Sequence, residues 1–163
     1  MHCAFGKVMS GLATLYSIGN RVPMPGTFGS IFGLILGVPF LLFFHIYIFL
    51  LFVALVAIFA FLSVERYLQR KDVTEDDPKE VIIDEVVGQL ISIIPIFLIS
   101  LNFDHLLIMC AISFLLFRFF DILKPWPISF FDKIKNSFGV IFDDVTAGIF
   151  AALLVYLIYI FLF

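Results

Sequence analysis

Charged residues are scarce in this chain of 163 residues, because Asp, Glu, Lys and Arg together make up only 14% of it. About a quarter of an ordinary soluble domain is charged, so the shortage excludes that class of protein. Hydrophobic residues account for 63%, phenylalanine alone for 23 residues, and the mean hydropathy is +1.15. The composition indicates an integral membrane protein. Its net charge is −3, and we expect no nucleic-acid partner.

Cysteine is equally scarce, with only Cys3 and Cys110 present. This pair indicates neither a disulfide framework nor a thiolate metal site. Signatures of covalent catalysis are missing too, since the chain has no Cys-x5-Arg loop, no Gly-x-Ser-x-Gly elbow and no Walker loop. We therefore expect chemistry that does not use a cysteine, serine or histidine nucleophile.

What the sequence does contain is a series of hydrophobic runs separated by short polar or proline-containing segments. The runs cover residues 28–44, 48–63, 81–101, 106–123 and 140–163. With their flanks they are long enough for helices that cross a bilayer core of about 30 Å. Within the third run, Pro95 is expected to kink the helix. The sequence predicts an all-α fold, a single membrane-embedded domain over residues 1–163 built as a bundle of about five hydrophobic helices.

The charges are distributed unevenly if the chain crosses the membrane at each run. All ten Lys and Arg then lie on the side of the N-terminus, and so does every acid except Asp104. The positive-inside rule makes that side cytoplasmic and leaves the C-terminus outside. We therefore expect the reactive groups to gather on the cytoplasmic face.

Two pairs of adjacent carboxylates stand where hydrophobic runs begin. Asp84 and Glu85 form one pair, Asp143 and Asp144 the other, and both occur in a pattern that reads Val-Ile-apolar-Asp-acid-Val. Ionised groups at a membrane boundary are costly unless they are paired or bind a metal. The repeated pattern therefore suggests chemistry at this interface.

Small residues follow the carboxylates at helical spacing, with Gly88 in line with Asp84 and Gly148 in line with Asp144. Such stripes let two helices pack closely, and carboxylates brought together need a shared proton or a cation. Oxygen ligands without His or Cys favour Mg²⁺, with Mn²⁺ as the other candidate. The alternative is that these acids only mark helix starts, where the dipole favours negative charge. Two matching pairs together with Asp121 favour a metal.

A ridge of mixed charge ends the fourth run, where Arg118, Asp121 and Lys124 follow at three-residue spacing. Arg binds phosphate with a planar fork and Lys binds it as a point charge. Alternatively, Arg118 and Asp121 pair with each other to hold the bundle, and Lys124 merely reaches towards water.

A second candidate anion site precedes the first hydrophobic helix. Gly26, Thr27, Gly29 and Ser30 follow a proline-rich stretch, and the turn expected there would offer backbone N–H groups and hydroxyls. Glycines then recur every four residues from Gly29 to Gly37, which predicts close packing at the centre of the bundle.

Four short segments share their motifs and their order with a known family. They read Pro-Gly-Thr-Phe-Gly-Ser at 25–30, Ile-Asp-Glu-Val-Val-Gly-Gln at 83–89, Phe-Arg-Phe-Phe-Asp-Ile-Leu-Lys-Pro-Trp-Pro-Ile at 117–128 and Asp-Asp-Val-Thr-Ala-Gly at 143–148. The sequence resembles the phosphatidylglycerophosphatase A family of bacterial lipid phosphatases. The resemblance implies an all-helical inner-membrane protein that uses Mg²⁺ to hydrolyse phosphatidylglycerol phosphate to phosphatidylglycerol and inorganic phosphate.

The residues and the resemblance together suggest a division of roles. The expected metal ligands are Asp84, Glu85, Asp121 and Asp144. Asp121 could instead aim Arg118. Asp143 would accept the proton of the attacking water or orient that water. Arg118 and Lys124 would neutralise the phosphoryl oxygens. The segment 26–30 would hold the substrate phosphate or close the pocket.

The alternative to an enzyme is a divalent-cation-binding membrane transporter or a scaffold without hydrolytic activity. A transporter should carry polar groups through the midplane, yet the runs offer little there beyond scattered Ser and Thr. A scaffold would need no paired acids. The sequence leaves the number of metal ions and the oligomeric state open.

Overall fold

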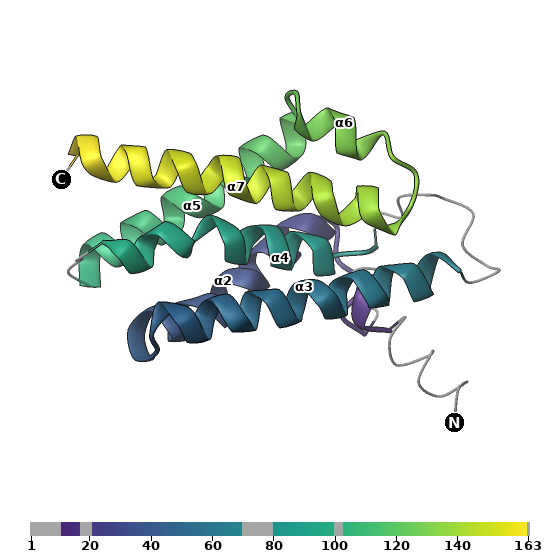
Figure 1. The fold of residues 1–163 in the computed structure, drawn as a ribbon, viewed down its shortest axis with the longest axis horizontal. Helices are drawn as coiled ribbons and strands as arrows, with labels where there is room; N and C mark the ends of the chain where they lie inside the picture. Colours follow the sequence, from purple (N-terminus) through teal and green to yellow (C-terminus); the bar gives the residue numbers. More distant parts are fainter. Residues whose placement is uncertain (1–10, 17–20, 70–79, 100–102, 163) are drawn as a thin grey trace.

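The computed structural model describes residues 11–16, 21–69, 80–99 and 103–162, which form a helical bundle with no β-strand among them. In chain order the helices are α2 (Pro25–Phe43), α3 (Ile46–Leu68), α4 (Ile83–Ser92), the 3₁₀ helix η1 (Ile94–Leu98), α5 (Phe103–Leu123), α6 (Ile128–Asp132) and α7 (Ser137–Leu162). Figure 1 shows the long helices side by side. The expected all-α membrane bundle is confirmed.

Four helices in the described part of the chain are each long and apolar enough to cross a membrane as a single helix. These are α2, α3, α5 and α7. The third hydrophobic run forms the ten-residue α4 and then the five-residue η1. Pro95 accounts for the break, since proline lacks an N–H and its ring clashes with the preceding helical turn. Even so, α4 and η1 together run the length of the bundle (Figure 1).

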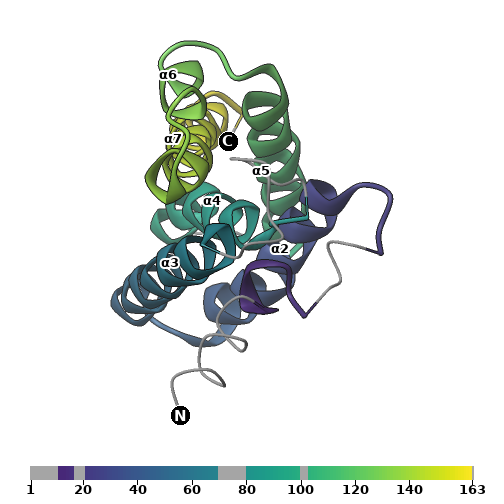
Figure 2. The ribbon, with the colours of Figure 1, turned by 90° about the vertical axis from the view of Figure 1, so that its right-hand side faces the viewer.

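The short α4 lies at the centre of the bundle, with α2, α3, α5 and α7 around it (Figure 2). Seven of its ten residues are buried, so α4 is a helix of the core and does not form a lipid-facing surface. Val86 and Leu90 of α4 belong to the main hydrophobic core together with Phe49 of α3 and Met109 of α5. Any group on α4 is therefore held by four neighbouring helices.

Glycines bring α2 and α7 unusually close to α4. A Cβ atom at Gly33 of α2 would lie 2.9 Å from Cβ of Gln89, and one at Gly88 would lie 2.7 Å from the backbone oxygen of Asp144. Both separations are shorter than carbon atoms tolerate, so only glycine permits these contacts. The small-residue stripes predicted from the sequence are the contact surfaces of the bundle.

A buried polar cluster joins α4 to α5. Gln89 Nε2 donates hydrogen bonds to Ser92 Oγ (2.8 Å) and to Ser113 Oγ (3.0 Å), and all three side chains are fully buried. Buried hydrogen bonds of this kind select one register between two helices. The cluster thereby fixes where the end of α5 lies relative to the start of α4.

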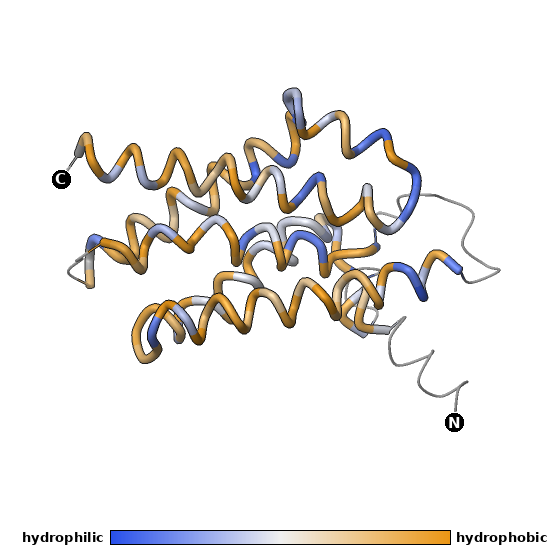
Figure 3. The backbone as a smooth tube through the Cα atoms, in the orientation of Figure 1, coloured by the Kyte–Doolittle hydropathy of each residue, from blue (hydrophilic) through white to orange (hydrophobic). Residues whose placement is uncertain are grey.

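Hydrophilic residues gather at the end of the bundle where α3 and α5 finish and α7 begins (Figure 3). Basic residues in segments at this end include Arg66, Arg118, Lys124, Lys133 and Lys135. Of the charged residues in the predicted asymmetry, the basic residues Lys7, Arg70, Lys71 and Lys79 and the acids Asp72, Glu75, Asp76 and Asp77 fall outside the described residues. The side chain of Asp104 is outside them as well.

Two helices begin earlier than the sequence suggested. α2 starts at Pro25, so residues 26–30 form its first turns and not a turn ahead of it; proline is favoured at this first helical position. α7 starts at Ser137, which places Asp143 and Asp144 beyond its first turn. Because the helix dipole acts mainly within the first turn, it does not account for that acid pair.

Candidate active site

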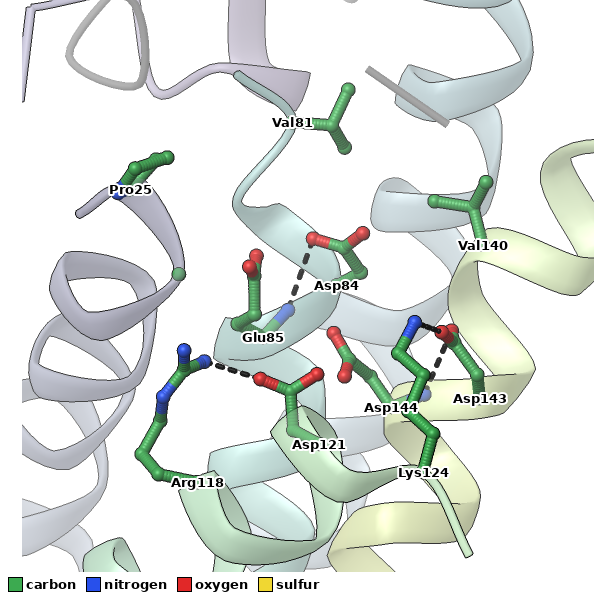
Figure 4. Close-up of a pocket in the computed structure, with 11 residues that line it drawn as sticks. Pro25, Val81, Asp84, Glu85, Arg118, Asp121, Lys124, Val140, Asp143 and Asp144 are labelled. Atoms are coloured by element: carbon green, nitrogen blue, oxygen red, sulfur yellow. Dashed lines mark hydrogen bonds and ion pairs between the residues drawn. The ribbon is translucent and has the colours of Figure 1, made fainter. Parts of the chain in front are cut away.

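A polar pocket of about 230 Å³ lies at the charged end, between α2, α4, α5 and α7 (Figure 4). It is lined by Pro25, Gly26, Val81, Asp84, Glu85, Arg118, Asp121, Lys124, Val140, Asp143 and Asp144. Every carboxylate and every cation singled out as a site residue in the sequence is in this lining. The structure thus gathers into one cavity groups that are spread over 60 residues of sequence.

Three carboxylates form the centre of the pocket. Asp84, Glu85 and Asp144 each offer an oxygen, and these oxygens lie within 4.8 Å of one another. Glu85 Oε2 is buried and has no hydrogen-bond partner, while Asp84 Oδ1 accepts the backbone N–H of Glu85 at 3.0 Å. Like charges this close are unstable without a proton or a cation between them. An all-oxygen donor set with an unused buried oxygen fits Mg²⁺ or Mn²⁺.

Arg118 lies beside this cluster and forms an ion pair with Asp121 through Nη1 and Oδ2. Its Nε is buried without a partner. The guanidinium also comes close to Gly26 of α2, where an added Cβ would lie 2.8 Å from Nη1 and 2.5 Å from Oε1 of Glu85. This ion pair is compatible with Asp121 aiming Arg118, and both roles considered for Asp121 stay predictions.

Lys124 forms an ion pair with Asp143, the neighbour of Asp144 on α7. Its Nζ lies 2.6 Å from Asp143 Oδ2 and also pairs with Asp132 of α6. Burial alone would lower the pKa of Lys124, but the two carboxylates raise this pKa well above its usual range. Lys124 is therefore a permanent cation at the rim of the pocket. Asp143 is fixed further by the backbone N–H of Asp144, which donates to its Oδ1 at 2.9 Å.

Asp132 forms an ion pair with the pocket residue Lys124, and the sequence analysis did not select it. α5 ends at Leu123, and the next residue, Lys124, has a left-handed φ of 43° and precedes Pro125; proline disfavours helical geometry in the residue before it. The chain then turns through α6, and Asp132 comes back beside Lys124. Pro125 and Pro127 predict a turn after α5. The sequence spacing does not show, however, which acidic residue the turn brings back next to Lys124.

The four residues predicted to hold an anion separate in the structure. Gly26 lines the pocket, whereas Thr27, Gly29 and Ser30 are not part of its lining. Gly29 and Ser30 are buried, and Ser30 Oγ donates to the carbonyl of Gly26 at 2.8 Å. The first turn of α2 thus meets the pocket through its backbone at Gly26.

A sequence model of one protein family, Phosphatidylglycerophosphatase A, matches residues 11–159. The chain belongs to this family. The resemblance read from the four motif segments is thereby confirmed, and with it the expectation of a phosphatase enzyme. All residues that line the pocket fall within the matched range.

Individual relatives agree with the family assignment. Phosphatidylglycerophosphatase A of Haemophilus influenzae is 41% identical over 151 residues, which are 90% of this chain and 86% of the relative. The Escherichia coli protein of the same name is 32% identical over 89 residues, 54% of this chain and 48% of the relative. A Bacteroides thetaiotaomicron protein, named provisionally as a phosphatidylinositol-3-phosphatase, is 33% identical over 102 residues, 63% of this chain and 62% of the relative. No solved structure matches the chain significantly.

Proposed function

We propose that this protein removes the terminal phosphate from phosphatidylglycerol phosphate and releases phosphatidylglycerol and inorganic phosphate, as a step of phospholipid biosynthesis. The observation that carries the proposal is one pocket, in a chain of this family, that holds three clustered carboxylates beside two cations. The carboxylates suit a divalent metal, and the cations suit phosphoryl oxygens. A lipid substrate is consistent with the position of the pocket at the end of membrane-spanning helices.

Mg²⁺ is the cofactor we propose, with Mn²⁺ as the second candidate, held by Asp84, Glu85 and Asp144. A divalent ion bound there would supply positive charge for the phosphoryl oxygens and would lower the pKa of the attacking water. The unpartnered oxygen of Glu85 supports this assignment, because a buried carboxylate oxygen without a donor is otherwise costly.

The two cations of the pocket would stabilise the negative charge on the phosphoryl group while it is transferred to water. Arg118, aimed by Asp121, and Lys124, held by Asp143 and Asp132, would neutralise the phosphoryl oxygens as the bond to glycerol breaks. When Lys124 turns towards the phosphate, Asp143 becomes available to accept the proton of the attacking water and to return it to the glycerol oxygen as the bond to phosphorus breaks. The first N–H groups of α2, at Gly26 and Thr27, have no partner within the helix and can add to phosphate binding.

We place this chemistry on the cytoplasmic face of the bacterial inner membrane. The support is the position of the basic residues Arg66, Arg118, Lys124, Lys133 and Lys135 in segments at the end of the bundle that holds the pocket, which the positive-inside rule assigns to the cytoplasm. There the phosphorylated headgroup can enter the pocket while the acyl chains stay in the bilayer.

The experiment that tests the proposal measures inorganic phosphate released by the purified protein in mixed micelles. Phosphatidylglycerol phosphate is offered with Mg²⁺, with Mn²⁺ and with EDTA, and phosphatidylinositol 3-phosphate is offered in parallel because of the Bacteroides relative. We expect release from phosphatidylglycerol phosphate that EDTA abolishes and Mg²⁺ restores. Release that survives EDTA would overturn the metal assignment, and hydrolysis of the inositol lipid alone would overturn the substrate.

Gly26→Ala should reduce turnover about tenfold or more, because small displacements of catalytic groups are expensive. The new methyl would meet Oε1 of Glu85 and Nη1 of Arg118, which are ends of flexible side chains and can move aside. Thermal stability should therefore change little. Phosphate release and melting temperature are measured together.

The matched control for this variant is Gly11→Ala. A Cβ at Gly11 would come no closer than 3.4 Å to the ring of Tyr16, which is ordinary contact. Gly11→Ala should keep full activity. Equal activity in the two variants would show that the approach of Arg118 and Glu85 to α2 does not matter for turnover.

A further inference from the structure

Two aromatic side chains project from the segment that joins α5 to α7. Trp126 is 82% exposed and Phe130 is 59% exposed. They are four residues apart, with Trp126 in the turn that leads into α6 (Ile128–Asp132) and Phe130 in α6 itself. Together these two exposed rings make up what is called here the apolar face of α6.

The opposite face of α6 is packed firmly against the bundle. Ile128 is fully buried in a cluster with Phe117, Ala147 and Ala151. The ring of Phe131 lies 5.9 Å from that of Phe142 on α7. These contacts settle which side of α6 faces inward, so the exposure of the two aromatic rings is a fixed feature of the fold.

The apolar face of α6 continues a surface that already faces lipid. The last turns of α5, a candidate membrane span, expose the large side chains Phe119, Ile122 and Leu123, and Trp126 follows directly. Exposed lysines come after α6, at Lys133 and Lys135.

A step from apolar side chains to aromatic rings and then to lysines is what a membrane–water interface favours. We propose that the α6 segment is an interfacial anchor, in which Trp126 and Phe130 insert into the lipid headgroup layer at the charged end of the bundle. The occupant of this face is thus the bilayer surface itself, with lipid phosphates beside the lysines.

The anchor has a consequence for the pocket. Trp126 is two residues from Lys124, which lines the pocket, and the packing of Phe131 on α7 ties α6 to the helix that carries the second acid pair. Fixing α6 at the headgroup layer therefore holds the mouth of the pocket at the depth of lipid phosphates.

The depth of Trp126 can be measured directly because it is the single tryptophan of the chain. The protein is reconstituted in vesicles of phosphatidylcholine and phosphatidylglycerol brominated either near the headgroup or near the chain end. We expect blue-shifted emission, weak quenching by aqueous acrylamide and a larger loss of intensity with shallow bromines than with deep ones. The readout needs no turnover, so it is independent of the proposed hydrolysis.

A depth standard comes from the variant Trp126→Phe/Leu115→Trp. Leu115 is 65% exposed on α5 and lies eight residues before the end of that helix, roughly 12 Å along its axis. Its tryptophan should respond most to deep bromines. Strong acrylamide quenching of Trp126 without lipid quenching would overturn the anchor by placing the segment in water. Resistance to both quenchers would overturn it in favour of a protein contact, such as a second copy of the chain.

Discussion

Asp144→Asn should abolish phosphate release, with a loss of roughly 10³-fold or more. The side chain is only 4% exposed and contributes one of the three clustered carboxylate oxygens. Asparagine keeps the shape but removes the charge that we propose to bind the metal. Asp84→Asn should behave in the same way, because its oxygen belongs to the same cluster.

The stability of the Asp144→Asn variant should change in a manner that depends on the metal. Without divalent ions, removing one of three neighbouring negative charges relieves repulsion, so the melting temperature in EDTA should equal or exceed that of the unchanged protein. With Mg²⁺, the unchanged protein gains stability by binding the ion and the variant gains little. Melting temperatures in detergent, with and without Mg²⁺, give this comparison without any substrate.

Glu65→Gln is the matched control for the acid variants. Glu65 lies near the charged end of α3 but does not line the pocket. This variant should keep both the activity and the Mg²⁺-dependent rise in melting temperature. Full turnover in Asp144→Asn, or an unchanged response of that variant to Mg²⁺, would contradict the assignment of the three carboxylates.

The sequence predicted the helix contacts of the fold better than it predicted the helix lengths. The glycine stripe of α2 and the small residues at Gly88 and Gly148 follow a local spacing rule, and their close contacts are present. The length of α4 was overestimated because hydropathy alone does not distinguish a kinked helix from one that ends. At Pro95 the chain ends its α-helix and continues as η1.

The site shows the same division between local and tertiary information. The meeting of Asp84 with Asp144 could be predicted, since each lies four residues before a glycine on a helix that packs against the other. The pairing of Lys124 with Asp132 could not, because it depends on how α6 folds back onto α7. The sequence left open whether Asp121 is a metal ligand or aims Arg118; the structure shows its ion pair with Arg118, and its role stays a prediction.

Gly148→Ala should cost about 1–3 kcal/mol of stability, the usual range for adding volume to a packed interior. A Cβ at this position would lie 3.1 Å from both the carbonyl carbon and the Cα of Gly88, and its carbonyl oxygen is nearer still. These are backbone atoms and cannot rotate away, so α7 has to move off α4. The melting temperature should fall by about 2–4 °C per kcal/mol.

The same displacement should weaken the metal site, because Asp144 lies one turn before Gly148 and would move away from Asp84. We therefore expect Gly148→Ala to need more Mg²⁺ for half-maximal phosphate release, even at temperatures where the variant is folded. Ala111→Val, which adds volume to the exposed side of α5, is the control and should change neither quantity. A destabilised Gly148→Ala protein with an unchanged Mg²⁺ requirement would show that the close contact serves the fold alone. A shift in both would show that the spacing of α4 and α7 sets the distance between the carboxylates.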